Sequence, residues 1–315
     1  MRGGTFFPKK SFPPAKLPQK KDSAINSQNP KIVLSASRRT DVPAFYMDWF
    51  MDRLRRGFFD LENPFSRAVS TISARPEDVH SIVFWSKDYG PFLSAERDRE
   101  LFALGYFPYF LFTVNSESTD LEPRVPPLAR RVQQLSALAG LRGPSAVTWR
   151  FDPVCFFERG GRAGDNLGDF ERIARAASEA GITRCVASFM DPYRKIGKRL
   201  ASRPGFAFRE PPMEERARVL LWMKEVLDSL CIRLFLCCEK EVLDVLGPDS
   251  GILPHACVDH GLLAGLYGPG GLSFARDRGQ RAAAGCGCHE SRDVGVYRLH
   301  PCPHACLFCY ANPRF

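Results

Sequence analysis

The chain lacks the long apolar segments of a membrane protein. None of its hydrophobic runs approaches the roughly 18 residues that a spanning helix needs, and its first residues carry charges and prolines where a secretory signal would have an apolar stretch. It also has no Walker loop and no dinucleotide-binding glycine pattern. We therefore expect a soluble cytoplasmic protein that makes no contact with a membrane.

The cysteines do not suggest a disulfide framework. Their number, eleven, is odd, and a chain of 315 residues can bury a sizeable core without covalent cross-links. No export signal accompanies them, so a reducing compartment fits better. Five of them lie in or beside apolar segments, where a free cysteine is usually a small buried hydrophobe: Cys155, Cys185, Cys231, Cys237 and Cys238. Cys257, in a predicted helical stretch with Val258 and Leu262, is expected to be buried too.

The positive charge is concentrated at one end. The net charge is +9, and residues 1–30 contribute five of these charges together with five prolines and little periodicity. We expect residues 1–30 to be a disordered basic tail that touches acidic surfaces nonspecifically. The remaining residues, 31–315, are expected to form a single α/β domain. Nucleic acid stays a weakly supported partner, because this body is only mildly basic.

Short apolar runs alternate with amphipathic stretches, which predicts parallel βαβ units. The expected strands are Ile32–Ala36, Ile82–Trp85, Tyr109–Val114, Ala146–Phe151, Cys185–Phe189, Ile232–Cys237 and Val294–Leu299. The expected helices are Ala44–Arg56, Pro91–Leu104, Leu128–Ala139, Leu167–Ala180 and Met213–Leu230. Such alternation builds either a doubly wound sheet or a (β/α) barrel.

Polar side chains follow each predicted strand, which favours a barrel or partial barrel. In a barrel all carboxyl-end loops converge on one face, whereas a doubly wound sheet gathers its site at one switch point. Such groups can bind a cofactor or substrate, or they can simply pair with one another, since loops are polar in most proteins. The candidate binding residues are Arg38, Arg39, Asp41, Arg150, Asp152 and Asp191.

The segment 255–315 has the composition of a metal-binding region. It holds five of the six histidines and six of the eleven cysteines. Three of these cysteines, Cys302, Cys306 and Cys309, have Cys-x-x-x-Cys-x-x-Cys spacing, and thiolate-rich sites select iron–sulfur clusters, zinc or Cu(I). Cys286 or Cys288 could join these three as the fourth ligand of a closed zinc site, so zinc is an alternative to an iron–sulfur cluster.

The triad, with the aromatic Phe308 before its last cysteine, resembles the cluster motif of radical S-adenosylmethionine enzymes. In that superfamily three cysteines hold a four-iron four-sulfur cluster whose fourth iron binds S-adenosylmethionine. One electron then cleaves the sulfonium and yields a 5′-deoxyadenosyl radical. The resemblance thus implies an enzyme with a reductant protein as partner, acting on an unidentified small molecule or macromolecule.

The superfamily usually carries this motif after its first strand, whereas here six residues follow Cys309. A circular permutation would reconcile the two, because Val294–Leu299 would precede the cluster loop and Ile32–Ala36 would lie next to it. Ser37-Arg38-Arg39-Thr40-Asp41 resembles a polar loop near the cluster of spore-photoproduct-lyase-like members.

Several ordered segments resemble a bacterial family of unknown function, DUF eighteen-forty-eight, over Ile32 to Asn312. They are Ser35 to Tyr46, Asn63-Pro64-Phe65, Ile82 to Lys87, Trp149 to Pro153, Ser188 to Tyr193, Gln280 to Cys288, Asp293 to Tyr297 and Cys302 to Asn312. No reaction is established for this family, so the resemblance does not predict the chemistry of the chain.

Cys286 and Cys288 have several open roles. They can ligate a second cluster or a zinc ion, or donate a hydrogen atom near the radical. Alternatively, one of them is a structural thiol and the other has no role. His300 and His304 flank Cys302 and can hydrogen-bond cluster sulfurs, although as ligands they would favour zinc. The competing hypothesis for the whole chain is a zinc-binding α/β module that contacts nucleic acid or a protein partner.

Overall fold

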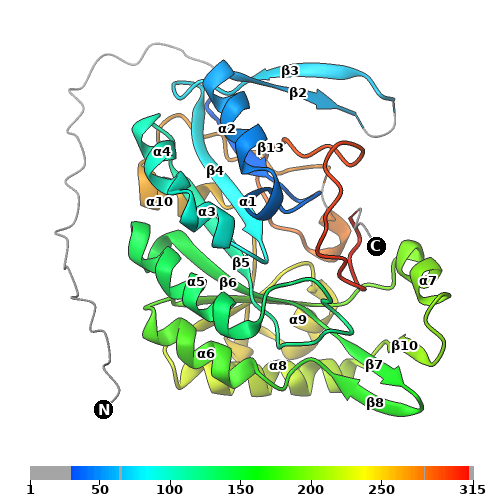
Figure 1. The fold of residues 1–315 in the computed structure, drawn as a ribbon. Helices are drawn as coiled ribbons and strands as arrows, with labels where there is room; N and C mark the ends of the chain where they lie inside the picture. The colour runs from blue at the N-terminus through cyan, green and yellow to red at the C-terminus, as the bar shows by residue number, and fades with distance from the viewer. Residues whose placement is uncertain (1–29, 64–65, 280, 312–315) are drawn as a thin grey trace, which may run out of the picture.

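The computed structural model describes residues 30–63, 66–279 and 281–311. Its centre is a parallel eight-stranded sheet in the order β12-β11-β9-β6-β5-β4-β1-β13 (Figure 1). The strands are β1 (Ile32–Ala36), β4 (Val79–Ser86), β5 (Pro108–Thr113), β6 (Val147–Val154), β9 (Arg184–Phe189), β11 (Arg233–Leu236), β12 (Leu253–Pro254) and β13 (Arg292–Asp293). Within the described ranges the edge strands β12 and β13 do not pair with each other, so a closed barrel is not seen.

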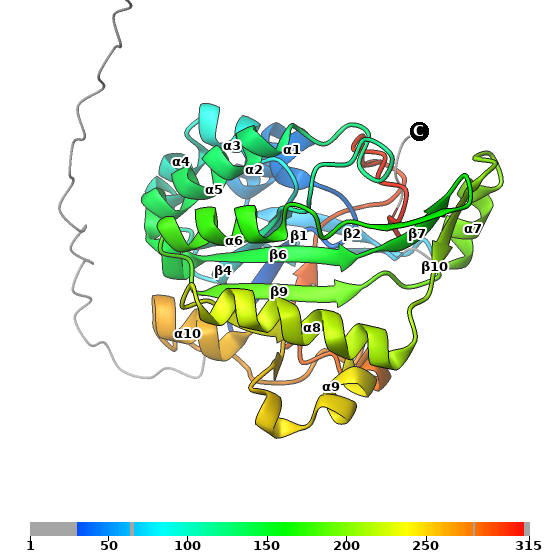
Figure 2. The same cartoon turned by 90° about the horizontal axis from the view of Figure 1, so that it is seen from below.

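Helices follow one another around the outside of the curved sheet, and α10 lies at the amino end of the strands (Figure 2). The helices are α1 (Val42–Phe45), α2 (Met47–Arg56), α3 (Gly90–Ser94), α4 (Arg97–Ala103), α5 (Leu128–Arg142), α6 (Phe170–Glu179), α7 (Arg194–Leu200), α8 (Met213–Asp228), α9 (Lys240–Leu246) and α10 (His260–Tyr267). Three short 3-10 turns are Pro144–Ala146, Pro248–Ser250 and Ala282–Ala284.

The central strands are buried on both faces, which explains their unbroken apolar sequence. Alternate residues such as Phe84 and Phe110 pack under the outer helices. Their neighbours Val83 and Leu111 point to the other face, where Leu263 of α10 covers them. The inner space is therefore filled with side chains at the amino end of the strands, and polar residues are left at the carboxyl end.

Two small antiparallel sheets extend from this core. Strands β2 (Phe58–Glu62) and β3 (Val69–Ser73) form a hairpin, and β7 (Phe156–Arg159) pairs with both β8 (Arg162–Asp165) and β10 (Phe206–Arg209). Neither sheet was expected from the sequence. The second one matters for function, because its aromatic side chains pack against the cysteine-rich C-terminal loop.

The sequence placed six of its seven strands within a few residues of their positions in the structure. The seventh prediction, Val294–Leu299, is wrong, since β13 ends at Asp293 and is two residues long. It does pair in parallel with β1, with Ser35 opposite Asp293. Two of the predicted helices are each divided in two, at Tyr46 and at Ala95–Glu96.

Other expectations have mixed outcomes. Cys231, expected in the core, is exposed. The tail predicted for residues 1–30 lies almost entirely outside the described residues, which begin at Pro30. Among the helices that the structure describes, none combines the length and apolar character required to cross a bilayer.

Candidate metal centre

A cavity of about 450 Å³ opens at the carboxyl ends of the parallel strands. It brings together all the candidate cofactor-binding residues and all the cysteines considered as metal ligands. Its lining includes Arg38, Arg39, Asp41, Arg150, Asp152, Asp191, Cys286, Cys288, Cys302, Cys306 and Cys309. Residues 250 positions apart in the chain thus share one site.

The loop that carries Cys302, Cys306 and Cys309 is fastened to several elements. The Leu307 amide donates to the carbonyl of Leu121 over 2.8 Å, and Arg199 of α7 donates to the carbonyls of Cys306 and Leu307. In Figure 1 the C-terminal segment, in red, lies beside α1. At that side the Tyr46 hydroxyl donates to the Pro301 carbonyl. The loop is therefore part of the domain and not a separate tail.

Asp41 ties this loop to the sheet. One carboxylate oxygen accepts from the Ala44 amide and the Ser86 hydroxyl at 3.0 and 2.7 Å. The other accepts from the Lys87 amide at 2.8 Å and lies 2.9 Å from His304 Nε2. Asp41 was predicted to bind cofactor or substrate, but both of its oxygens are engaged within the protein. Its position makes it a positioning residue for the cysteine loop.

Asp293 likewise joins two segments, by holding β13 against the loop after β1. It was not among the candidate site residues predicted from the sequence. Its carboxylate accepts from the hydroxyls of Ser35 and Ser37 at 2.9 and 2.7 Å, and from the Arg38 amide at 2.7 Å. An acidic residue next to a short apolar segment was the only available signal. These bonds fix the loop after β1 against the strand that leads to the cysteines.

The remaining predicted charges are grouped as ion pairs around the cavity. Arg150 pairs with Asp152, which also accepts from the Ser188 hydroxyl, and both of these charged side chains are largely buried. Asp191 pairs with Arg281 in a more exposed position. This pairing was the alternative that the sequence left open. The cavity wall nevertheless presents both signs of charge at close range.

Arg38 and Arg39 diverge from each other. The Arg38 guanidinium lies 5.1 Å from the Trp85 ring centroid and donates to Ser291 at 3.1 Å. Arg39 donates to the Gly295 carbonyl at 2.9 Å. Both side chains therefore have protein partners while still lining the cavity.

In the triad, Cys302 and Cys306 are buried and Cys309 is half-buried, and burial raises the pKa of each thiol. The pKa of Cys302 rises to about 12, and burial likewise raises those of Cys306 and Cys309. The Lys87 ammonium, held by Glu122 at 2.6 Å, lies close enough to Cys306 to favour its thiolate. A metal ion binding here must displace protons from these thiols.

Within the described ranges, no three His, Cys, Asp or Glu side chains already surround one point as metal ligands. The two flanking histidines are occupied elsewhere. His304 faces Asp41, and Nδ1 of His300 accepts from the Val296 amide while its ring packs 4.1 Å from that of Trp49. The donors available in this loop are therefore the thiols.

A second group of thiols lies in the same cavity. Cys237 and Cys238 follow β11, Cys257 follows β12, and Cys286 and Cys288 precede β13. All five pack in one cluster on the inner face of the sheet. The sequence reading assigned Cys237, Cys238 and Cys257 to the core. Cys237 and Cys238 lie at the carboxyl end of a predicted strand, and that position was the available signal. Cys257 follows β12, which was not predicted, so no comparable signal for it was present in the sequence.

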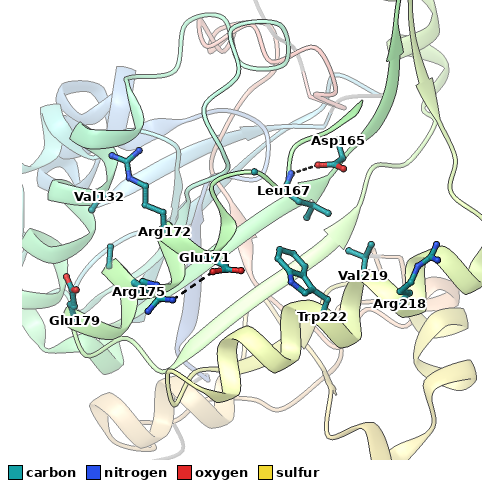
Figure 3. A pocket seen from close by; sticks show the side chains of 12 residues that line it. Val132, Asp165, Leu167, Glu171, Arg172, Arg175, Glu179, Arg218, Val219 and Trp222 are labelled. Carbon is teal, nitrogen blue, oxygen red and sulfur yellow. Dashed lines mark hydrogen bonds and ion pairs between the residues drawn. The ribbon is translucent and has the colours of Figure 1, made fainter. Parts of the chain in front are cut away.

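Another hollow, of about 1120 Å³, lies on the outer surface between α6 and α8. Figure 3 shows Trp222 and Val219 of α8 on one side of it and Glu171 of α6 on the other. None of the residues predicted to bind a metal or cofactor lines it. We attribute no chemistry to this surface.

The family model of a domain of unknown function, DUF1848, matches residues 33–311. The chain belongs to this family. No curated protein matches the chain at a significant level. The DUF1848 match ends just after the cysteine loop, so the family model includes both the sheet and all of the cavity-lining cysteines.

Proposed function

We propose that this DUF1848 protein is a radical S-adenosylmethionine-type enzyme. In this proposal Cys302, Cys306 and Cys309 hold a four-iron four-sulfur cluster at the cavity. The observation that carries it is the meeting of three thiols, two of them buried and Cys309 half-buried, with a cavity of about 450 Å³ lined by charges of both signs. When bound, the cluster would supply one electron to the sulfonium of S-adenosylmethionine.

The donor set fits an iron–sulfur cluster with an open position. The loop offers three thiols, and neither His300 nor His304 is free to act as a fourth ligand. Four cysteines would close the cluster to substrate, whereas three leave one iron accessible. A zinc module that only docks to a partner would have no use for a charged internal cavity.

The cavity also suits a zwitterionic ligand with a sulfonium charge. Arg38, Arg39 and Arg150 can face a carboxylate, and Asp152 and Asp191 can face an ammonium group. Arg150 is paired with Asp152, and Arg281 with Asp191, so the charges of the cavity wall are balanced. A ligand that carries both a positive and a negative group can therefore bind without leaving a protein charge of either sign unpaired. Asp41 would act indirectly, by holding the cysteine loop.

We further propose that the sheet is an open, circularly permuted (β/α) barrel. Parallel pairing of β13 with β1 supports this, because it sets the last strand where a first barrel strand would stand. The cysteine loop then follows that strand, as in the superfamily that the motif resembles. Barrel active sites lie at the carboxyl ends of the strands, which is where this cavity is.

The test is anaerobic reconstitution with iron and sulfide. We expect about four irons and four sulfides per triad, and release of 5′-deoxyadenosine when the reduced protein receives S-adenosylmethionine. Cys306→Ser should remove this iron and bring 5′-deoxyadenosine to background. Cys231→Ser, which changes an exposed thiol, is the matched control and should retain both.

Stoichiometric zinc at the triad without labile sulfide would overturn the proposal. So would iron and sulfide contents that Cys306→Ser leaves unchanged.

A further inference from the structure

We propose that Cys237, Cys238, Cys257, Cys286 and Cys288, here called the thiol ring, form a second metal site. It would bind one thiophilic ion of the Zn²⁺ type through four thiolates, separately from Cys302, Cys306 and Cys309. This inference does not depend on the proposed function, because it concerns different thiols, which pack in a different cluster from Cys306 and Cys309.

The sulfur spacing carries the argument. The Sγ atom of Cys237 lies 3.9 Å from that of Cys238 and 3.6 Å from that of Cys257. Further thiol contacts join Cys238 to Cys286, Cys286 to Cys288, and Cys288 to Cys257. The five sulfurs therefore make a closed circuit of neighbours.

The two measured distances are close to the sulfur spacing around one tetrahedral ion. Zn–S bonds of about 2.3 Å place the sulfurs at the corners of a tetrahedron about 3.8 Å apart. A four-iron cluster would separate its ligands more widely, since each thiolate binds a different iron. Within the described ranges no three of these side chains surround one point yet, so binding requires side-chain rotation as well as the loss of protons.

Cations around the thiol ring would stabilise the charge of such a site. One Zn²⁺ with four thiolates has a net charge of about −2. Arg38 contacts Cys288, Arg150 lies near Cys237 and Cys257, and Arg281 lies near Cys238. Three guanidinium groups thus surround a set of side chains that are mostly neutral thiols without a metal.

Two of these arginines have donors that lack an acceptor. Arg38 Nη2 and Arg150 Nε are buried and have no hydrogen-bond partner among the described residues. A buried N–H group without a partner costs about 1–3 kcal/mol. Both arginines line the cavity with the thiol ring, and metal-bound thiolates are good acceptors for such donors.

The experiment uses the full chain carrying Cys302→Ser, Cys306→Ser and Cys309→Ser, titrated with Co²⁺ without oxygen. We expect thiolate-to-cobalt charge-transfer absorption that saturates at one ion per chain and disappears when Zn²⁺ is added. Adding Cys257→Ser together with Cys288→Ser leaves three thiols in the ring and should weaken binding at least about tenfold. Adding Cys231→Ser instead should change nothing.

A second measurement needs no change to the ring. Zn²⁺ should protect the half-buried thiols of Cys238 and Cys286 from alkylation, while exposed Cys231 continues to react. Absence of charge-transfer absorption, indifference to the paired changes Cys257→Ser and Cys288→Ser in a variant with an unchanged circular dichroism spectrum, or absence of protection would overturn the proposal. Iron with sulfide in this triad-free chain would overturn the single-ion assignment.

The outcome is separable from that of the proposed function. Failure of the triad to bind iron appears in the chain with an intact triad, and leaves the Co²⁺ titration of the triad-free chain unaffected.

Discussion

Asp41 shows how one buried carboxylate can organise a site without touching a ligand. It accepts hydrogen bonds from the start of α1 and from the end of β4, and it faces His304 in the cysteine loop. Its two oxygens thus join three segments that are distant in sequence. Charge-assisted bonds of this kind are stronger than neutral ones, so the geometry of the loop depends on this side chain.

Asp41→Asn should destabilise the domain and loosen the cysteine loop. An amide presents an NH₂ group to donors that need an acceptor, so at least one buried donor loses its partner, at a cost of about 1–3 kcal/mol. Urea unfolding measures the loss. Asp48→Asn is the control, because Asp48 is 93% exposed and should stay within about 0.5 kcal/mol of wild type. Equal effects of the two substitutions would contradict this role.

The sequence predicted which residues face the cavity better than it predicted what they contact. Asp41 and Asp152 follow strand ends, and that position alone brings them to the cavity. Their partners could not be derived, because His304 and Ser188 reach them from segments whose placement depends on the whole fold. Cys237 was misread for a related reason: an apolar strand end can be the core or the rim of a site.

Side-chain hydrogen bonds fix strand β13 in place, because its backbone pairing with β1 is very short. It contributes two residues to the sheet edge, and Asp293 secures it through the hydroxyls of Ser35 and Ser37. Gly295 follows at a point where the backbone passes very close to the loop after β1. A Cβ atom added there would lie 2.2 Å from Ser37 Oγ and 2.9 Å from Ser37 Cβ.

Gly295→Ala should therefore displace the segment that leads to the cysteines. Overpacking at such a contact costs about 1–3 kcal/mol, and we expect lower thermal stability together with weaker metal retention at the triad. Gly140→Ala is the matched control, since nothing lies within 4 Å of an added Cβ there. Gly140 is inside α5, so this change should stabilise by up to about 1 kcal/mol. A Gly295→Ala protein as stable as wild type would refute the close-approach argument.

The prediction of a strand at Val294–Leu299 failed at the level of the element. The stretch has a strand-like composition, but a strand also needs a neighbour. β1 ends at Ala36 and turns into the loop that Asp293 holds, so the residues after Val294 have no extended partner. Composition indicated a strand in the right region, and the length of β1 decided where it stops.

At the scale of the whole molecule, a partly buried carboxyl group makes folding depend on pH. Glu239 is the N-cap residue of α9, and its side chain accepts from the Phe189 amide at 2.7 Å. Burial raises its pKa from 4.5 to about 7, although that hydrogen bond and Arg216 act in the opposite direction. Because the folded state prefers the protonated form, Glu239 costs stability as pH rises from about 4.5 to 7.

Glu239→Gln should remove this dependence. Glutamine keeps an acceptor for the Phe189 amide without the buried charge, so the variant should gain on wild type as pH rises and level off above pH 7, by at most about 3 kcal/mol. Urea unfolding between pH 5 and 8 measures the difference. Glu241→Gln, at an exposed position of the same helix, should leave the pH profile unchanged. A constant offset at all pH values would rule out titration of Glu239.

The position of β13 at one edge of the sheet, beside β1, also has a consequence for biosynthesis. Residues 292–311 leave the ribosome after every other strand of the sheet has been made, and the earlier part of a domain begins to fold first. The outer core can thus form while the cavity still lacks the wall that carries Cys302, Cys306 and Cys309. In the proposed function, a metal can therefore bind the three thiols only after all the other strands of the sheet have been made. A chain that ends before residue 292 should keep the outer core and bind no metal at the triad.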